Sequence, residues 1–169
     1  MSGPARHLVL TGPMGVGKST VASLVGARLG RLVRDSDTDL QLLFGSTGAT
    51  LAARHGVDEL HRLESAVLLG SLAVDSPIVI GAAASVVEDG RCLDALSRLA
   101  ETIVLTAPVE VLLARLPAGS HRRPVTAETL GRLAERRHPL YDSVATAIVD
   151  GNDRPSVVAD RVIEILQSP

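Results

Sequence analysis

The stretch "TGPMGVGKST", residues 11–20, decides how the rest of the sequence is interpreted. Its glycines, lysine and serine fit the pattern G-x-x-x-x-G-K-[ST]. A short apolar run at residues 8–10 precedes it, and residues 18–29 have the apolar spacing of a helix. In a strand–loop–helix of this kind, backbone N–H groups and the helix N-terminus face a phosphate, and the lysine reaches the β and γ oxygens. The stretch therefore predicts a site for a nucleoside triphosphate.

Lys18 is the only lysine of the chain. Its compact ammonium suits a phosphate at this position, where the broad fork of arginine would not substitute. The competing interpretation is a glycine-rich turn that holds a lysine by chance. If the motif is real, Ser19 ligates Mg²⁺, and the residues that contact ATP are Gly12, Gly15, Val16, Gly17, Lys18, Ser19 and Thr20.

Composition excludes several classes of protein. The chain has 169 residues, a length typical of one domain, and we expect a single domain over residues 1–169. A net charge of −2 and a pI near 6.2 provide no basic field for nucleic acid. The single cysteine, Cys92, permits no internal disulfide, and no apolar run reaches the length of a membrane helix. We expect a cytoplasmic monomer that binds neither nucleic acid nor membrane.

Strand-like and helix-like segments alternate along the chain, which predicts a parallel sheet covered on both faces. The expected strands are residues 8–10, 32–33, 78–80, 103–105 and 147–149. The expected helices are residues 18–29, 37–44, 57–74, 92–99, 109–116, 126–141 and 156–166. The polar segment "PAGSHRRPVT", residues 117–126, has the composition of a lid.

Three carboxylates occupy alternate positions where the second strand should end: Asp35, Asp37 and Asp39. An extended backbone would turn them to one side. Asp35 and Asp37 suit a magnesium site and a base for an acceptor hydroxyl. The alternative is that Asp37 caps the next helix and that Asp39 only stabilises its first turn. We prefer the functional interpretation for Asp35 and Asp37, and the structural one for Asp39.

The order of motifs resembles the shikimate kinases, and the resemblance covers nearly the whole chain. It rests on the phosphate-binding loop at residues 12–19 (the P-loop), on "DSD" at residues 35–37, on Glu64, and on "RRHPLYDSVA" at residues 136–145. It implies a three-layer α/β/α P-loop fold with a five-stranded parallel sheet in the order 2-3-1-4-5 and a short lid. It also implies transfer of the γ-phosphoryl group of ATP, with Mg²⁺, to a hydroxyl of a small hydroxy acid or polyol, with shikimate among the candidates.

The same resemblance implies roles for individual residues. Asp35 would hold a magnesium-bound water, and Asp37 would orient or deprotonate the acceptor hydroxyl. Arg137 would pair with an acceptor carboxylate, unless it is an ordinary solvated arginine. Arg115 would flank the adenine, unless it is only a favourable charge at a helix end. The remaining assignments are Arg123 on the lid against the transferred phosphoryl group, with Arg154 and Pro155 beside the adenine.

Two departures from the family pattern fall where the acceptor should bind. His61 stands where the family has an arginine. The bidentate contact of that arginine with an acceptor carboxylate is therefore lost, unless the side chain of Arg62 turns toward the acceptor. Where the family has three consecutive glycines, this chain has Gly81, Ala82 and Ala83, and the methyl groups of the two alanines should narrow or reshape the acceptor pocket. The acceptor is therefore left open, and the alternative function is a nucleotide-binding relative without kinase turnover.

Overall fold

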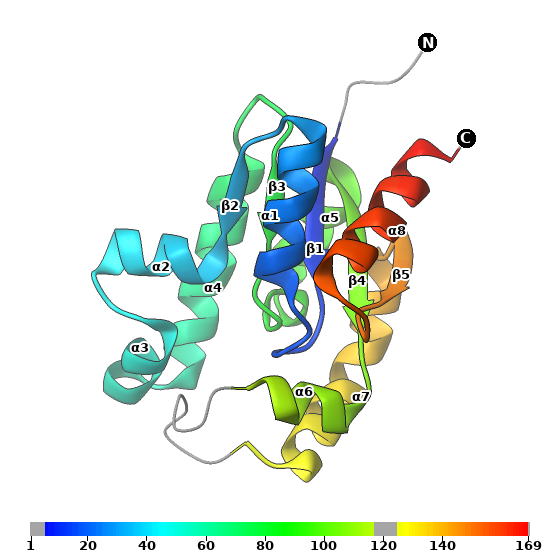
Figure 1. Cartoon of the computed structure of the whole chain (residues 1–169). Helices are drawn as coiled ribbons and strands as arrows, with labels where there is room; N and C mark the ends of the chain where they lie inside the picture. The colour runs from blue at the N-terminus through cyan, green and yellow to red at the C-terminus, as the bar shows by residue number, and fades with distance from the viewer. Residues whose placement is uncertain (1–5, 117–124, 169) are drawn as a thin grey trace.

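The computed structural model describes residues 6–116 and 125–168. Within these residues the chain forms a five-stranded parallel sheet in the order β2-β3-β1-β4-β5, with helices on both faces (Figure 1). The strands are β1 (His7–Thr11), β2 (Val33–Asp35), β3 (Val79–Gly81), β4 (Ala100–Thr106) and β5 (Ala147–Asp150). The predicted three-layer α/β/α architecture and strand order are confirmed.

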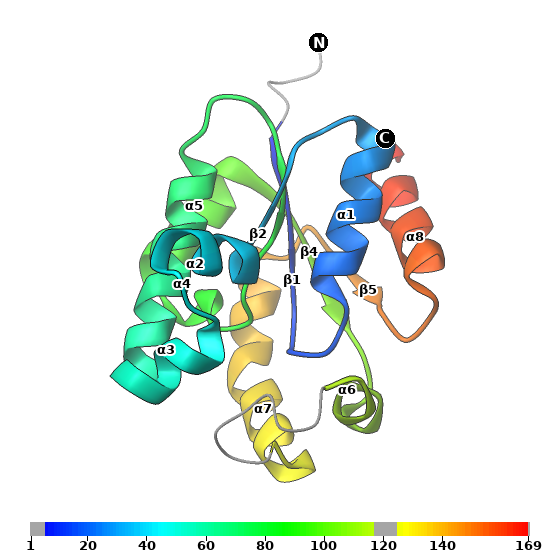
Figure 2. The same ribbon diagram turned by 60° about the vertical axis from the view of Figure 1, so that its left-hand side comes forward.

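Two helices pack on one face of the sheet and three on the other, against separate sets of buried residues. Figures 1 and 2 show the two layers from two sides. The first pair is α1 (Lys18–Leu29) and α8 (Pro155–Gln167). The opposite layer holds α4 (Val57–Leu72), α5 (Gly90–Leu99) and α7 (Ala127–Val144). Shorter elements lie around the carboxyl ends of the strands: α2 (Ser36–Phe44), α3 (Gly48–His55), α6 (Val109–Arg115) and the 3-10 turn η1 (Val86–Glu88).

Strand β1 separates two aliphatic cores. Leu8 and Leu10 pack on the side of α1 and α8, whereas Val9 packs on the side of α4 and α5. All three side chains are fully buried. Successive side chains of a strand point to opposite faces, and a parallel sheet covered on both faces buries both sets. Among the described residues, no helix is both long and apolar enough to cross a membrane.

The predicted bounds of the elements lie within three residues of the observed ones, and the largest differences are that β4 begins at Ala100 and not at residue 103 and that α7 ends at Val144 and not at residue 141. Two further differences concern β2 and α3. The second strand begins at Val33 and not at residue 32, because Leu32 is 76% exposed and only its carbonyl takes part in pairing, accepting from Val79 N. Helix α3 is absent from the predicted elements. It is short, it begins at a Thr47 cap, and it buries one side chain, that of Leu51. Its eight residues are fewer than the window over which a helical period can be recognised in a sequence.

The turn from β2 into α2 overturns the expectation for the three carboxylates. The backbone is helical from Ser36, so Asp37 and Asp39 do not continue an extended strand. Asp35 is the cap of α2, and its side chain accepts from Thr38 N at 3.2 Å. Asp39 lies in the first turn, as the structural interpretation predicts, and also accepts twice from Arg34 Nε at 3.1 and 2.9 Å.

Helix α1 packs closely on the sheet at Gly26. A Cβ atom at this position would lie 2.1 Å from Val33 Cγ2 and 3.2 Å from the carbonyl oxygen of Arg31. The valine methyl belongs to a stiff, β-branched side chain that cannot swing aside. By contrast, a Cβ atom at Gly131, inside α7, would meet nothing within 4 Å.

We expect Gly26→Ala to destabilise the protein by about 1–3 kcal/mol, because the added methyl group overpacks the contact between α1 and β2. Gly131→Ala is the matched control and should stabilise by about 0.5–1 kcal/mol, since alanine favours a helix and has room there. Urea unfolding of both variants measures this. Equal effects of the two substitutions would contradict the close packing at Gly26.

Candidate active site

The P-loop between β1 and α1 owes its shape to three glycines with positive φ. These are Gly12 at 137°, Gly15 at 81° and Gly17 at 99°. The constraint is strongest at Gly12, where a Cβ atom would lie 2.2 Å from the carbonyl oxygen of Leu105 in β4. The loop is thus held against the sheet and curls before α1 begins, which turns its N–H groups and the helix N-terminus toward one point.

Lys18 lies over this loop. Its Nζ donates to the carbonyl oxygens of Gly12 and Pro13, both at 2.9 Å. Burial lowers the pKa of Lys18 to about 8, against the opposing charges of Asp37 and Asp35. Backbone carbonyls are weaker partners for an ammonium than a charged oxygen, so an anionic ligand on the loop would be favoured over them.

Ser19 and Asp35 meet beside the P-loop. Ser19 Oγ donates to Asp35 Oδ2 at 2.5 Å. A hydroxyl and a carboxylate are the oxygen ligands that Mg²⁺ accepts, and Mg²⁺ commonly takes its other ligands from phosphates and water. No group of three or more His, Cys, Asp or Glu side chains able to hold a metal occurs in the described part of the chain. With one hydroxyl and one carboxylate, the Ser19–Asp35 pair fits a magnesium ion shared with a nucleotide.

Gly81 lies behind this pair, at the end of β3. It is paired with Asp35 on one side and with Leu10 on the other. A Cβ atom there would be 3.0 Å from Asp35 Oδ2 and 3.7 Å from Ser19 Cα. A side chain at this position would push the carboxylate, so the glycine is required for close packing rather than for an unusual φ.

Asp37 lies on the first turn of α2, near Lys18 and Asp35. Burial and the charge of Asp35 raise its pKa, while Lys18 opposes the shift. A carboxylate of raised basicity close to the P-loop lysine is suited to accept a proton from a hydroxyl, or to hold that hydroxyl in place. The structure thus brings together Lys18, Ser19, Asp35 and Asp37, as predicted from the sequence.

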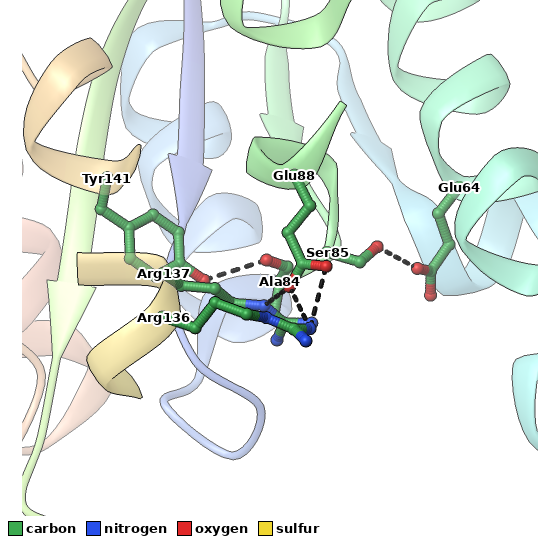
Figure 3. A network of polar contacts seen from close by, with 7 residues as sticks. All are labelled: Glu64, Ala84, Ser85, Glu88, Arg136, Arg137 and Tyr141. Atoms are coloured by element: carbon green, nitrogen blue, oxygen red, sulfur yellow. Dashed lines mark hydrogen bonds and ion pairs between the residues drawn. The ribbon is translucent and has the colours of Figure 1, made fainter. Parts of the chain in front are cut away.

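A second polar cluster joins η1, α4 and α7 (Figure 3). Arg137 Nε donates to Glu88 Oε1 at 2.5 Å, and Arg136 Nη2 donates to both oxygens of Glu88 at 2.8 and 2.9 Å. Ser85 Oγ donates to the carboxylate of Glu64. In the same cluster, Tyr141 Oη donates to the carbonyl oxygen of Ala84 at 3.0 Å.

The ionisable groups of this cluster are shifted in different directions. Burial opposes ionisation of Glu88, but hydrogen bonds from Arg137 and Arg136 dominate and hold its pKa below the usual value. Burial raises the pKa of Glu64. Burial, followed by the charge of Arg137, lowers the pKa of His61, so this imidazole is mainly neutral at pH 7.

The predicted acceptor residues are only partly brought together. Arg137 is 5% exposed, so the alternative that it is a solvated arginine is wrong. Arg62 does not turn toward Arg137, because it pairs with Glu59 at 3.0 Å and its side chain is 74% exposed. His61 is half-buried and interacts with Arg137 and Glu88.

The expectation that alanine methyl groups narrow the acceptor pocket is wrong for Ala82. This residue is fully buried, its methyl group belongs to the core on the α4 and α5 side, and its N–H donates to Leu10 O at 2.9 Å. Ala83 packs against the same core, and its N–H donates to Ser36 Oγ at 3.1 Å. No described residue other than glycine has a positive φ, so the alanines are unstrained.

On the predicted adenine side, Arg115 joins the P-loop to the end of β5. Its Nη1 donates to Gly151 O at 3.0 Å and to Val16 O at 3.4 Å. It also lies in the last turn of α6, where a positive charge is favourable. Arg154 caps α8, and Pro155 is its first residue. Arg123 and nearly all of the predicted lid lie outside the described residues.

Glu88 and Arg136 are absent from the residues predicted from the sequence. Glu88 follows the two buried valines of η1, so only the three-dimensional arrangement reveals that it reaches α7. Arg136 resembles several other charges on the same helix. The sequence holds only a weak signal for Glu88. If Arg137 is buried it needs a carboxylate partner, and Glu88 is the acidic residue nearest to the alanines at residues 82–84.

The P-loop, the Ser19–Asp35 pair and the carboxylate of Asp37 define a P-loop kinase. A family model described as shikimate kinase matches residues 14–167. A shikimate kinase of Streptomyces avermitilis is 35% identical over 167 residues, with 95% of each chain covered. One of Pseudomonas putida is 32% identical over 167 residues, which cover 96% of this chain and 95% of the relative. The chain therefore belongs to the shikimate kinase family.

A solved structure supports the same assignment. The shikimate kinase of Acinetobacter baumannii in complex with shikimate has a TM-score of 0.89 to this chain at 25% identity, covering 95% of this chain and 92% of the other. Membership of the family makes the chain a phosphotransferase that uses ATP and Mg²⁺ and takes an alcohol group as acceptor.

We expect Ala82→Gly to destabilise the protein by about 1–2 kcal/mol, since it removes a buried methyl group and adds backbone freedom. Thermal unfolding measures this. Because the methyl group faces the core, the KM of any acceptor should not change. A lower acceptor KM with unchanged stability would show that the methyl group does line the pocket.

The low pKa of Glu88 predicts how stability depends on pH. A carboxylate with a folded pKa below its unfolded value stabilises above the unfolded value, near 4.5, and loses that contribution as pH falls through the folded pKa. Glu88→Gln should therefore lower the free energy of unfolding by about 1–3 kcal/mol at pH 7. The difference from the wild type should shrink below about pH 4.5. A difference that does not depend on pH would contradict the ion pairs.

Proposed function

We propose that this protein transfers the γ-phosphoryl group of ATP to a hydroxyl of a small hydroxylated metabolite held beside Asp37. The observation that carries the proposal is the convergence of Lys18, the Ser19–Asp35 pair and Asp37 at the carboxyl ends of β1 and β2. For phosphoryl transfer a protein must hold the phosphates of the donor, provide a site for Mg²⁺ and position the acceptor hydroxyl, here with a carboxylate.

In the proposed reaction the acceptor oxygen forms a bond to the γ-phosphorus as the bond to the β,γ-bridging oxygen breaks, and ADP leaves. The hydroxyl proton passes to Asp37 or, through it, to solvent. Lys18 exchanges its contacts with the carbonyls of Gly12 and Pro13 for phosphate oxygens. The ion held by Ser19 and Asp35 would supply charge neutralisation at the phosphates.

The acceptor is the open part of the proposal. The relatives are named as shikimate kinases, and one of their structures is a complex with shikimate, so shikimate is the first compound to test. Other small hydroxy acids and polyols belong in the same panel. We further propose Arg123 against the transferred group, and Arg115, Arg154 and Pro155 beside the adenine, as predicted from the sequence.

We also propose a single domain over residues 1–169, with a lid near residues 117–126, that acts in the cytoplasm as a monomer without nucleic acid. Support comes from the net charge of −2, which offers no basic field, and from the single cysteine. That cysteine, Cys92, is buried and does not form a disulfide, as suits a reducing compartment.

Two substitutions test the assigned roles. Lys18→Ala should lower kcat by about 10²-fold or more, because a donor to the transferred group is lost. Asp37→Asn should lower kcat by about 10²–10⁴-fold, since the amide cannot accept the proton. Both are measured by acceptor-dependent release of ADP across the panel.

Asp39→Asn is the matched control, because it lies on the same helix turn but pairs with Arg34. It should lower the melting temperature and leave kcat unchanged. Full activity of Asp37→Asn would remove Asp37 from the role of base. If ATP raises the melting temperature of the wild type but no acceptor stimulates ADP release, the protein is a nucleotide-binding relative without turnover.

A further inference from the structure

The acceptor side of the site contains one deeply buried cation. Arg137 is 5% exposed and interacts electrostatically with Lys18 and Glu64, which also interact with Asp37. These groups therefore lie within electrostatic range of one another near the P-loop. An acidic acceptor would need a cation there in addition to Lys18, which faces the phosphates.

Arg137 already has a carboxylate partner. Its Nε donates to Glu88 Oε1 at 2.5 Å, and the same carboxylate accepts two hydrogen bonds from Arg136 Nη2. Figure 3 shows both guanidinium groups against Glu88, which reaches them from the turn after the alanine segment. Because this carboxylate is part of the chain, it competes with any ligand at a high effective concentration. It also stays ionised at neutral pH, since hydrogen bonds from the two arginines, opposed by burial, hold its pKa low.

A ligand carboxylate could approach Arg137 only by displacing Glu88 or by lying next to it. Displacement would leave the side chain of Glu88, which is 24% exposed, without its two partners. Lying next to it would place two like charges within a few ångströms in a partly desolvated site. Either arrangement lowers the affinity for an anion below that of an Arg137 without a carboxylate partner.

The other groups on this side are suited to hydroxyls. Glu64 offers carboxylate oxygens, and Ser85, which donates to Glu64, can still accept a hydrogen bond. His61 adds a half-buried imidazole within electrostatic range of Arg137 and not a second fixed positive charge. Vicinal hydroxyls satisfy such acceptors without bringing a charge.

We infer that the acceptor is an uncharged polyhydroxy compound, and that Glu88 excludes carboxylate-bearing acceptors by occupying Arg137. This inference rests on the proposed kinase function and names the chemical class of its acceptor. Glu88 is then a specificity-determining residue. It acts through Arg137 and takes no part in the phosphoryl transfer itself.

Matched pairs of acceptors test the inference: shikimate with its uncharged methyl ester, and gluconate with glucitol. The assay is acceptor-dependent ADP release by the wild type, by Glu88→Gln and by the control Glu128→Gln. Glu128 forms an exposed ion pair with Arg132 on α7. The control therefore also removes one carboxylate from an ion pair with arginine, but away from Arg137. Binding is measured in parallel by calorimetry, with Mg²⁺ and a non-hydrolysable ATP analogue present.

We expect the wild type to prefer the uncharged member of a pair by about tenfold or more in kcat/KM, from loss of like-charge contact. Glu88→Gln should raise kcat/KM for the acid by about tenfold and change that for the neutral compound by less than about threefold, because only the anion meets Glu88. Glu128→Gln should alter neither. The calorimetric affinities should follow the same order.

Two results overturn the inference, and they are distinguishable. If the wild type uses the acid at least as well as its neutral counterpart, and Glu88→Gln weakens the acid, then Glu88 positions Arg137 for an acceptor carboxylate and the kinase function stands. If neither member of either pair binds or stimulates ADP release, while the ATP analogue binds, the proposed function fails and the inference falls with it.

Discussion

The parallel pairing of β2, β3 and β1 is the constraint on which the site depends. It sets Asp35, Gly81 and Leu10 level with one another at the carboxyl ends of the strands. From there the chain enters the P-loop after β1 and helix α2 after β2, so that Ser19 meets Asp35. A shift of one residue in this register would turn the carboxylate to the opposite face of the sheet. Val33, which packs against the core beside α1, opposes such a shift, and the neighbouring strands β3 and β1 are buried along their length.

A second constraint comes from the burial of Arg137. A guanidinium that is almost withdrawn from water must have a charged partner, and the partner can be part of the chain or part of a ligand. Glu88 supplies it from within the chain. The arrangement stabilises the fold before any acceptor arrives, and it offsets one of the two adjacent guanidinium charges that an acidic acceptor would use. Stability and specificity thus depend on the same ion pair.

The donor half of the site could be predicted from the sequence because it is local. Gly12 to Thr20 are contiguous, and a glycine-rich loop with a lysine, set between a strand and a helix, is typical of a phosphate site. The strand order followed from the family resemblance. The acceptor half could not be predicted in the same way, because Glu64, Glu88 and Arg137 come from three separate elements. The buried methyl group of Ala82 and the cap formed by Asp35 likewise depend on backbone geometry that spacing alone does not specify.

This difference between the halves has a consequence for how the site can vary. The P-loop is held by backbone contacts, such as that of Gly12 with the carbonyl of Leu105, so most substitutions there break the donor site. The acceptor side is formed by side chains on η1, α4 and α7. A single substitution among them can change the charge of the site without moving the sheet. An acidic residue at position 88 and a histidine at position 61 alter the charge presented to the acceptor, while Lys18, Ser19 and Asp35 keep their places. Phosphate chemistry and acceptor choice are therefore physically separable in this fold, and the acceptor is to be identified from the side chains around Arg137 and not from the P-loop.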